Sequence, residues 1–243
     1  MTRRGDWMNV QAPRPAPEAI EGDLLADTVA ALPSRARMID YGCLGWRAAR
    51  LAAAIGRGDL EQFGVDLGAE PAGRPPAARF LTLAAPGAGL PALEADLLVA
   101  SHVLEHCTDP VAIFATWLHA VRPGGRIYVE APSDRAALPC SSDDAEDHAF
   151  GNFWDDPTHV RPWPAAALYR LALSWGAVPE RCLHAVRGGI HCGVALIRRV
   201  DAAPPRYRYI SLRDVPPGLA HALAHAGIDP PRTTPPSLTL TPP

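Results

Sequence analysis

The feature that most constrains the fold is an alternation of short apolar segments with amphipathic ones across residues 36–131. Strands are predicted at Ala36–Tyr41, Gln62–Leu67, Arg79–Leu83, Asp96–Val103 and Arg126–Ala131. Apolar residues at helical spacing fill Arg47–Ile55, and Asp109 followed by Pro110 is typical of the start of a further helix. Strands that alternate with helices in this way predict an α/β fold whose parallel sheet is covered by helices on both faces.

The end of this alternation has a different pattern. A helix is predicted over Ala165–Trp175. Two strand-like segments, Arg181–Val186 and His191–Val200, follow it on either side of Gly188-Gly189. Strands joined by so short a glycine connection form an antiparallel hairpin. We therefore expect the parallel sheet to end in an antiparallel pair.

The chain divides into three parts by composition. Residues 1–35 form a proline-containing leader with one amphipathic helix that ends before Pro33, and residues 36–200 form the α/β domain. Within that domain, residues 134–163 are interpreted as an insertion that covers the substrate. Residues 201–243 form a proline-rich tail, predicted to wrap the surface or to lack regular structure.

Charge and cysteine content exclude several classes of protein. The formal net charge is −3 and Lys and Arg do not cluster, so we predict no nucleic-acid partner. The 5 cysteines are scattered without a C-x-x-C pair, which argues against a disulfide framework or a zinc site and favours reduced thiols in the cytoplasm. No apolar run reaches the roughly 18 residues of a membrane span, and the polar N-terminus is unlike a signal peptide. Assembly as a homodimer is left open.

A glycine turn after the first strand is the clearest sign of a ligand site. The segment Met38–Arg47 has the pattern of a strand, an acid, a glycine turn and a helix. In an open parallel sheet, ligands bind beyond the carboxyl ends of the strands, where helix N–H groups are free. Gly42 and Gly45 would let a ligand approach the backbone, and Asp40 would orient the loop. Asp66 ends the next strand about 20 residues later, where a carboxylate accepts hydrogen bonds from ribose hydroxyls.

The same turn argues against a dinucleotide cofactor. A pyrophosphate is held by the pattern G-x-G-x-x-G, whereas this chain has only Gly42 and Gly45 in the spacing G-x-x-G, followed by Trp46. An adenosyl ligand without phosphates needs fewer N–H donors. A nicotinamide-dependent oxidoreductase is therefore the less favoured alternative.

Three segments together resemble class I S-adenosylmethionine-dependent methyltransferases, in particular the small enzymes related to those for ubiquinone and menaquinone. They are the glycine turn Met38–Arg47, the fourth-strand segment Asp96–His106 and the segment Val121–Glu130 that leads into the fifth strand. The resemblance covers Ala36–Pro132 and implies a Rossmann-like fold with a seven-stranded, mostly parallel sheet and the terminal hairpin. It also implies S-adenosylmethionine as the cofactor, bound by Asp40, Gly42, Cys43, Gly45, Asp66, Ser101 and His102.

Two positions in the turn depart from the family pattern. Leu44 and Trp46 stand where the family usually has its second and third glycines, and the third strand ends without the acid that commonly meets the adenine amino group. These departures favour an alternative, a methyltransferase-like protein that binds a ligand or a partner without turnover. Asp40 and Asp66 favour a working enzyme.

Histidines near the predicted acceptor site indicate the kind of acceptor. Methyl transfer from a sulfonium needs a base only when the acceptor arrives protonated, as a hydroxyl does, and histidine suits that task near neutral pH. His159, in the aromatic and acidic segment Phe150–Trp163, is the preferred base, and His106 after the fourth strand is the second candidate. We therefore expect O-methylation of a small molecule. The predicted substrate contacts are Trp154, Asp155, Asp156 and Arg161.

Other interpretations of these residues are open. His106 belongs to a Glu-His pair that the family uses for loop architecture as well as for catalysis. The residues around His159 are also typical of a turn that leads into the next helix. A metal site of Asp155, Asp156 and His159 is weaker, because D-D-x-x-H on a loop is poor evidence, and no metal is predicted.

Overall fold

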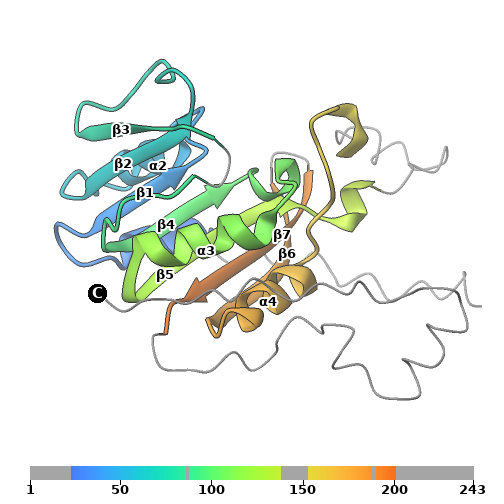
Figure 1. The fold of residues 1–243 in the computed structure, drawn as a ribbon. Coiled ribbons are helices and arrows are strands. Elements are labelled where there is room, and N and C mark those ends of the chain that lie inside the picture. Colours follow the sequence, from blue (N-terminus) through green and yellow to red (C-terminus); the bar gives the residue numbers. More distant parts are fainter. Residues whose placement is uncertain (1–22, 86–87, 138–152, 188–189, 201–243) are drawn as a thin grey trace, which may run out of the picture.

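The computed structural model describes residues 23–85, 88–137, 153–187 and 190–200. In these residues, seven strands form one sheet in the order β3-β2-β1-β4-β5-β7-β6 (Figure 1). The strands are β1 (Arg37–Tyr41), β2 (Glu61–Leu67), β3 (Ala78–Leu83), β4 (Ala95–Ser101), β5 (Val121–Pro132), β6 (Val178–Arg187) and β7 (Ile190–Arg198). Strands β1 to β5 pair in parallel, whereas β7 is antiparallel to both β5 and β6. The predicted Rossmann-like sheet with a terminal hairpin is confirmed.

Helices cover both faces of this sheet. Residues of α1 (Leu24–Ala30) and α2 (Arg47–Ala54) pack on one face, and residues of α3 (Pro110–Ala120) and α4 (Ala165–Ser174) pack on the other. Figure 1 shows α2 on the opposite side of the sheet from α3 and α4. Short 3-10 helices connect the larger elements: η1 (Leu104–His106), η2 (Asp134–Ala137) and η4 (Phe153–Asp155).

The central strands are buried because they are apolar on both sides. Met38 and Leu97 belong to the core that includes α1 and α2. Their chain neighbours Ile39 and Leu98 belong to the core that includes α3 and α4. Successive side chains of a strand point to opposite faces, so a sheet covered on both faces needs consecutive apolar residues. This requirement explains the apolar segments from which the strands were predicted.

The boundary between α3 and β5 differs from the prediction. The fifth strand was expected to begin at Arg126, but β5 begins at Val121, directly after α3 ends at Ala120. The register between β4 and β5 shifts in this stretch, as it does at a β-bulge. Glycine is needed there because a Cβ on Gly125 would lie 2.7 Å from the carbonyl oxygen of Ala95.

Several predicted parts lie outside the described residues. α1 falls within the helix predicted before Pro33, but residues 1–22 of the leader lie outside the described part of the chain. Residues 138–152 of the predicted insertion and residues 201–243 of the proline-rich tail also lie outside it. Within the described ranges, no helix is both long and apolar enough to cross a membrane.

Candidate active site

The glycine turn after β1 is held against β2 and against the loop after β4. The backbone N–H groups of Gly42 and Cys43 both donate to the carbonyl oxygen of Val65, at 2.7 and 3.2 Å. Gly42 has a φ of 75°, and a Cβ at this position would lie 2.5 Å from Cγ2 of Val103. Glycine is therefore required at position 42 by both backbone conformation and packing.

Asp40 anchors the helix that follows the turn. Its buried carboxylate accepts a hydrogen bond from the backbone N–H of Ala48 in the first turn of α2, at 3.0 Å. Burial raises the pKa of Asp40 to about 6, although hydrogen bonds from the backbone of Ala48 and Ala49 oppose the shift. The structure thus places Asp40 where it orients the loop.

The two bulky residues of the turn lie in different environments. Leu44 is 78% exposed, whereas Trp46 is completely buried. The indole of Trp46 packs with Cys43 and Phe80 beneath α2, and its Nε1–H donates to the carbonyl oxygen of Pro71 at 3.2 Å. The ring therefore lies under the helix, and not at the edge of the sheet where a ligand would bind. The burial of Trp46 removes one of the two observations that favoured a protein without turnover, and Leu44 is the other.

Asp66 and Gly45 lie at the edge of the sheet formed by the carboxyl ends of the parallel strands. Asp66 lies near the end of β2, partly exposed, and its Oδ1 accepts a hydrogen bond from the backbone N–H of Leu67 at 2.7 Å. A Cβ on Gly45 would meet no other atom within 4 Å. Packing therefore does not require glycine at position 45, and the space beside it is open to a ligand.

A buried charged network, which the sequence did not predict, connects β5 to the helix after the turn. Glu130 is fully buried and receives hydrogen bonds from the hydroxyl of Tyr128 at 2.6 Å and from the hydroxyl of Ser101 at 3.2 Å. Arg47 forms an ion pair with Glu130 at 2.5 Å and also donates to Ser101. Burial opposes the charge of Glu130, but hydrogen bonds from His102, Arg47 and Tyr128 outweigh it and lower its pKa to about 2. The sequence signal that could have predicted this network is Glu130 itself, a charged residue near the end of an otherwise apolar strand.

His102 is a charged part of the same network. The strand predicted to reach Val103 ends at Ser101, because His102 has a φ of 56° and turns the chain. Its imidazole lies 3.2 Å from the carboxylate of Glu105 and 3.5 Å from that of Glu130. Burial lowers its pKa, but interactions with Cys192 and these two carboxylates outweigh burial and raise the pKa to about 11. His102 is therefore a cation at neutral pH, unsuited to act as a base.

The structure brings His106 and His159 together although they are far apart in sequence. Their ring centroids lie 4.7 Å apart. The backbone N–H of Val160 donates to the carbonyl oxygen of Glu105 at 2.6 Å, which joins segment 153–163 to the loop after β4. His159 also stacks on Phe153, with ring centroids 4.4 Å apart.

Hydrogen bonds fix the tautomer of both histidines. Nδ1 of His159 lies 2.6 Å from the carbonyl oxygen of Phe153, an acceptor, so this nitrogen carries the hydrogen. The hydroxyl of Thr158 donates to Asp156 at 2.6 Å and therefore accepts from Nδ1 of His106 at 2.8 Å. In the neutral state, both rings keep an unshared electron pair on Nε2.

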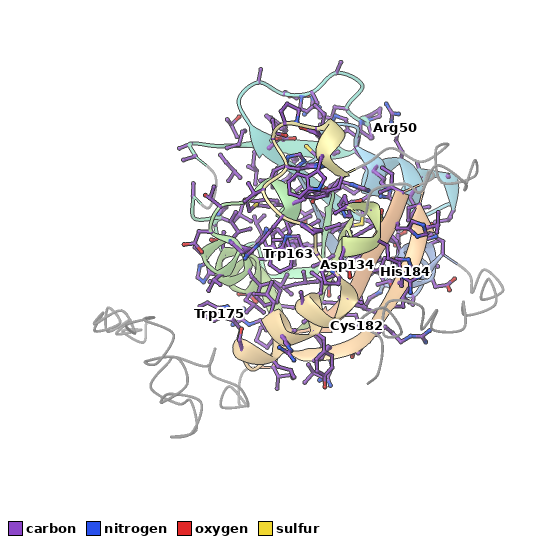
Figure 2. All side chains as sticks on the ribbon, turned by 90° about the vertical axis from the view of Figure 1, so that its right-hand side faces the viewer. Arg50, Asp134, Trp163, Trp175, Cys182 and His184 are labelled. Carbon is purple, nitrogen blue, oxygen red and sulfur yellow. The ribbon has the colours of Figure 1, made fainter. Side chains whose placement is uncertain are left out.

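The four predicted substrate contacts differ in exposure and in the groups that they contact. Trp154 is 59% exposed. The guanidinium of Arg161 lies over the ring of Trp163, 4.4 Å from its centroid. Asp156 accepts two hydrogen bonds from Thr158, which hold its pKa below the usual value. The side chain of Asp155 lies outside the described part. Figure 2 faces this end of the molecule, with Trp163 and Asp134 near its middle and His184 to one side.

Comparison with protein families decides the identity of this domain. The sequence matches the family described as the methyltransferase domain over residues 14–177. The chain belongs to this methyltransferase family. It is a class I S-adenosylmethionine-dependent methyltransferase, an enzyme with S-adenosylmethionine as its cofactor, as the three sequence segments predicted.

Solved structures share the fold at low sequence identity. An S-adenosylmethionine-dependent methyltransferase from Mesorhizobium loti is 19% identical, with a TM-score of 0.54 over 71% of this chain and 96% of that one. The 1,6-didemethyltoxoflavin-N1-methyltransferase of Burkholderia thailandensis is 20% identical, with a TM-score of 0.53 over 80% of this chain and 81% of that one. The [4+2]-cyclase SpnF is 15% identical, with a TM-score of 0.52 over 72% of this chain and 80% of that one. A comparison with curated proteins finds no match.

The residues of this methyltransferase fit its cofactor. Asp66 offers a partly exposed carboxylate at the end of β2, beside a turn whose Gly45 has no neighbour in the way. Trp46, the bulkiest departure from the family pattern, is buried beneath α2. This edge therefore offers a carboxylate that could accept hydrogen bonds from ribose hydroxyls, and an unobstructed backbone beside it.

Proposed function

We propose that this methyltransferase acts on a hydroxyl group of a small molecule, with His159 as the base and His106 beside it as the second catalytic residue. The observation that carries the proposal is the hydrogen bonding of the two rings. Each Nδ1–H is held by an acceptor, Phe153 in one case and Thr158 in the other, so each Nε2 keeps an electron pair that can accept a proton, and the Asp156 carboxylate lies 3.8 Å from Nε2 of His159.

The chemistry of methyl transfer explains why a base matters. The sulfonium of the cofactor supplies the activation, so the protein contributes mainly position and a dry pocket. A hydroxyl must lose its proton as it attacks, whereas a neutral amine can attack with its lone pair. A pair of imidazoles whose Nε2 atoms can accept a proton therefore favours an oxygen acceptor. A base at this position typically accelerates transfer by about 10²- to 10⁴-fold.

The remaining site residues take roles around that centre in this proposal. Asp66 accepts hydrogen bonds from the ribose hydroxyls, and Ser101 and His102 flank the methionine end of the cofactor. The residues of the glycine turn that lie near the adenosyl group are Asp40, Gly42, Cys43 and Gly45. The substrate contacts are Trp154, Asp155, Asp156 and Arg161. The exposed indole of Trp154 supports an apolar or aromatic acceptor, because a ring can stack on it.

The acceptor is proposed to be a small molecule. The Burkholderia thailandensis structure contains 1,6-didemethyltoxoflavin and S-adenosylhomocysteine, which supports this class for a chain of similar fold. The absence of a nucleic-acid partner and a cytoplasmic location stay predictions, and assembly as a homodimer stays open.

The test is a methyl-transfer assay with labelled S-adenosylmethionine and matched acceptors. Aromatic compounds that differ only in bearing a hydroxyl, an amine or a thiol would be compared for the native chain, His159→Ala and His119→Ala. His119 is an exposed histidine at the end of α3 and serves as the control. We expect transfer to the hydroxyl compounds, lost in His159→Ala and kept in His119→Ala. Transfer to amines or thiols alone would overturn the proposal.

A further inference from the structure

A cluster of three side chains suited to a metal ion lies between the loop after β4 and segment 153–163. We propose that Glu105, His106 and His159 bind a divalent first-row transition-metal ion. Each offers one ligand atom, and the three atoms lie within 4.8 Å of one another. This set differs from the Asp155, Asp156 and His159 combination considered from the sequence, because the buried carboxylate comes from the loop after β4.

Glu105 is the strongest reason for this inference. Its side chain is completely buried, and neither carboxylate oxygen has a hydrogen-bond partner among the described residues. The nearest charge is His102, whose Nδ1 lies 3.2 Å from Oε1, and His102 also faces Glu130. Burying a carboxylate without hydrogen bonds is costly unless a cation compensates for it. His102 supplies part of that charge but shares it with Glu130, and a metal ion would supply the rest.

The two histidines are oriented as metal ligands usually are. A ligating imidazole commonly donates its other N–H to a carbonyl or another acceptor, which fixes the ring and its tautomer. His159 donates to the carbonyl oxygen of Phe153, and His106 donates to the hydroxyl of Thr158, which Asp156 orients in turn. Both rings therefore carry their free electron pair on Nε2 before any ion arrives.

The backbone already holds the ligands near one another. The bond from Val160 N–H to the carbonyl oxygen of Glu105 joins the residue after His159 to the residue before His106. Stacking on Phe153 restricts the ring of His159 further. Ligand atoms about 2.0–2.2 Å from one ion lie closer together than 4.8 Å, so binding requires small side-chain rotations.

The ligand set defines the class of ion. Two imidazoles and one carboxylate suit Zn²⁺, Fe²⁺, Co²⁺ or Ni²⁺, whereas Mg²⁺ and Ca²⁺ prefer oxygen ligands alone. Three protein ligands leave further coordination positions for water or a substrate oxygen. If the proposed function holds, an acceptor hydroxyl that occupied one of these coordination positions would release its proton to solvent more readily. His159 would then act as a ligand and not as a free base.

Zinc titration of the full chain tests the binding directly. The protein would be stripped with a chelator and titrated with Zn²⁺ in a calorimeter without S-adenosylmethionine, and Co²⁺ absorption would report the ligand geometry. We expect one site that Glu105→Gln, His106→Gln and His159→Ala each weaken by more than about tenfold. His106 is exposed, so its variant tests the site even if replacement of Glu105 disturbs folding.

The matched control is another histidine pair on β6 and β7. His184 Nε2 lies 3.1 Å from His191 Nδ1, and this pair is the obvious competitor for zinc. His184→Ala should leave the Zn²⁺ affinity unchanged. Loss of binding in His184→Ala, or unchanged binding in both His106→Gln and His159→Ala, would overturn the proposal.

Failure of the metal site is distinguishable from failure of the proposed function. If the chelated chain still methylates hydroxyl compounds and does not bind Zn²⁺, the metal site is wrong and the function stands. If Zn²⁺ binds as described but no hydroxyl compound is methylated, the function is wrong and the site stands.

Discussion

The indole of Trp46 occupies the space that any side chain at position 64 would need. A Cβ on Gly64 would lie 2.2 Å from Cζ3 of Trp46 and 2.8 Å from Sγ of Cys43. Trp46 also has a φ of 51°, the left-handed conformation in which glycine is the usual residue. The turn therefore keeps a backbone suited to glycine while its large side chain fills a space provided by a glycine in β2.

This relationship predicts strong coupling between positions 46 and 64. Gly64→Val should destabilise the fold by about 1–3 kcal/mol through overpacking. Trp46→Gly should lower the free energy of unfolding by about 3–5 kcal/mol because burial is lost. Relief of the left-handed backbone strain should offset roughly 1–2 kcal/mol of that loss. In the double variant the valine enters the space that Trp46 leaves. The destabilisation of the double variant should therefore be smaller than the sum of the two single destabilisations. Urea unfolding of the four proteins measures this, and additivity within about 0.5 kcal/mol would contradict the relationship.

Asp66 should contribute to cofactor affinity. Asp66→Ala removes the acceptor at the end of β2 and should weaken S-adenosylhomocysteine binding by roughly 10- to 100-fold, since hydrogen bonds to a charged group contribute about 1.5–3 kcal/mol. Isothermal titration calorimetry measures the affinity. Glu70→Gln, which removes an exposed carboxylate paired with Arg74, is the control and should bind normally. Equal affinity in both variants would mean that the ribose lies elsewhere.

His159 should affect turnover more than cofactor binding. His159→Ala removes the proposed base, or one ligand of the proposed metal ion, and leaves the glycine turn untouched. We expect kcat to fall by about 10²-fold or more while S-adenosylhomocysteine affinity changes little. Steady-state kinetics and calorimetry on the same preparation separate the two effects. A large loss of cofactor affinity with normal kcat would assign His159 to loop structure.

Glu130 should make the fold sensitive to acid. Its folded pKa is lowered to about 2 from 4.5, so its stabilising contribution is present above about pH 4.5 and is lost as the pH falls toward 2. Glu130→Gln should therefore be less stable than the native chain at pH 7, by about 2–3 kcal/mol. The difference should shrink as the pH is lowered below 4.5.

Urea unfolding of both proteins from pH 7 down to pH 3 tests this acid dependence. The comparison uses a difference because Asp40, with a pKa raised to about 6, acts in the opposite direction: its protonation stabilises the folded state as the pH falls from about 6 to about 4. Asp40 is present in both proteins, so its effect cancels. A difference that stays constant down to pH 3 would mean that the pKa of Glu130 is not lowered in the folded state.

Sequence patterns predicted most of the fold because they are local. Apolar segments, the Asp109–Pro110 helix start and the Gly188-Gly189 connection each act within a few residues. The seven strands and the four α-helices of the described residues followed from such patterns, whereas the short helices η1, η2 and η4 were not predicted. The limits of β5 were missed because its bulge depends on the approach of Ala95 to Gly125, a contact between two strands. Local pattern carries no information about such a contact.

The site was only partly predictable for the same reason. The sequence by itself determined an alternation of strands and helices with Asp40 and Asp66 near strand ends, because strand positions follow from periodicity, and the family resemblance implied the methyltransferase-type sheet. The tertiary structure alone decided that Trp46 lies beneath α2, that Glu130 is charged and buried, and that Glu105 and His106 meet His159. Packing and electrostatics join residues by distance in space, and more than fifty residues of chain separate His106 from His159.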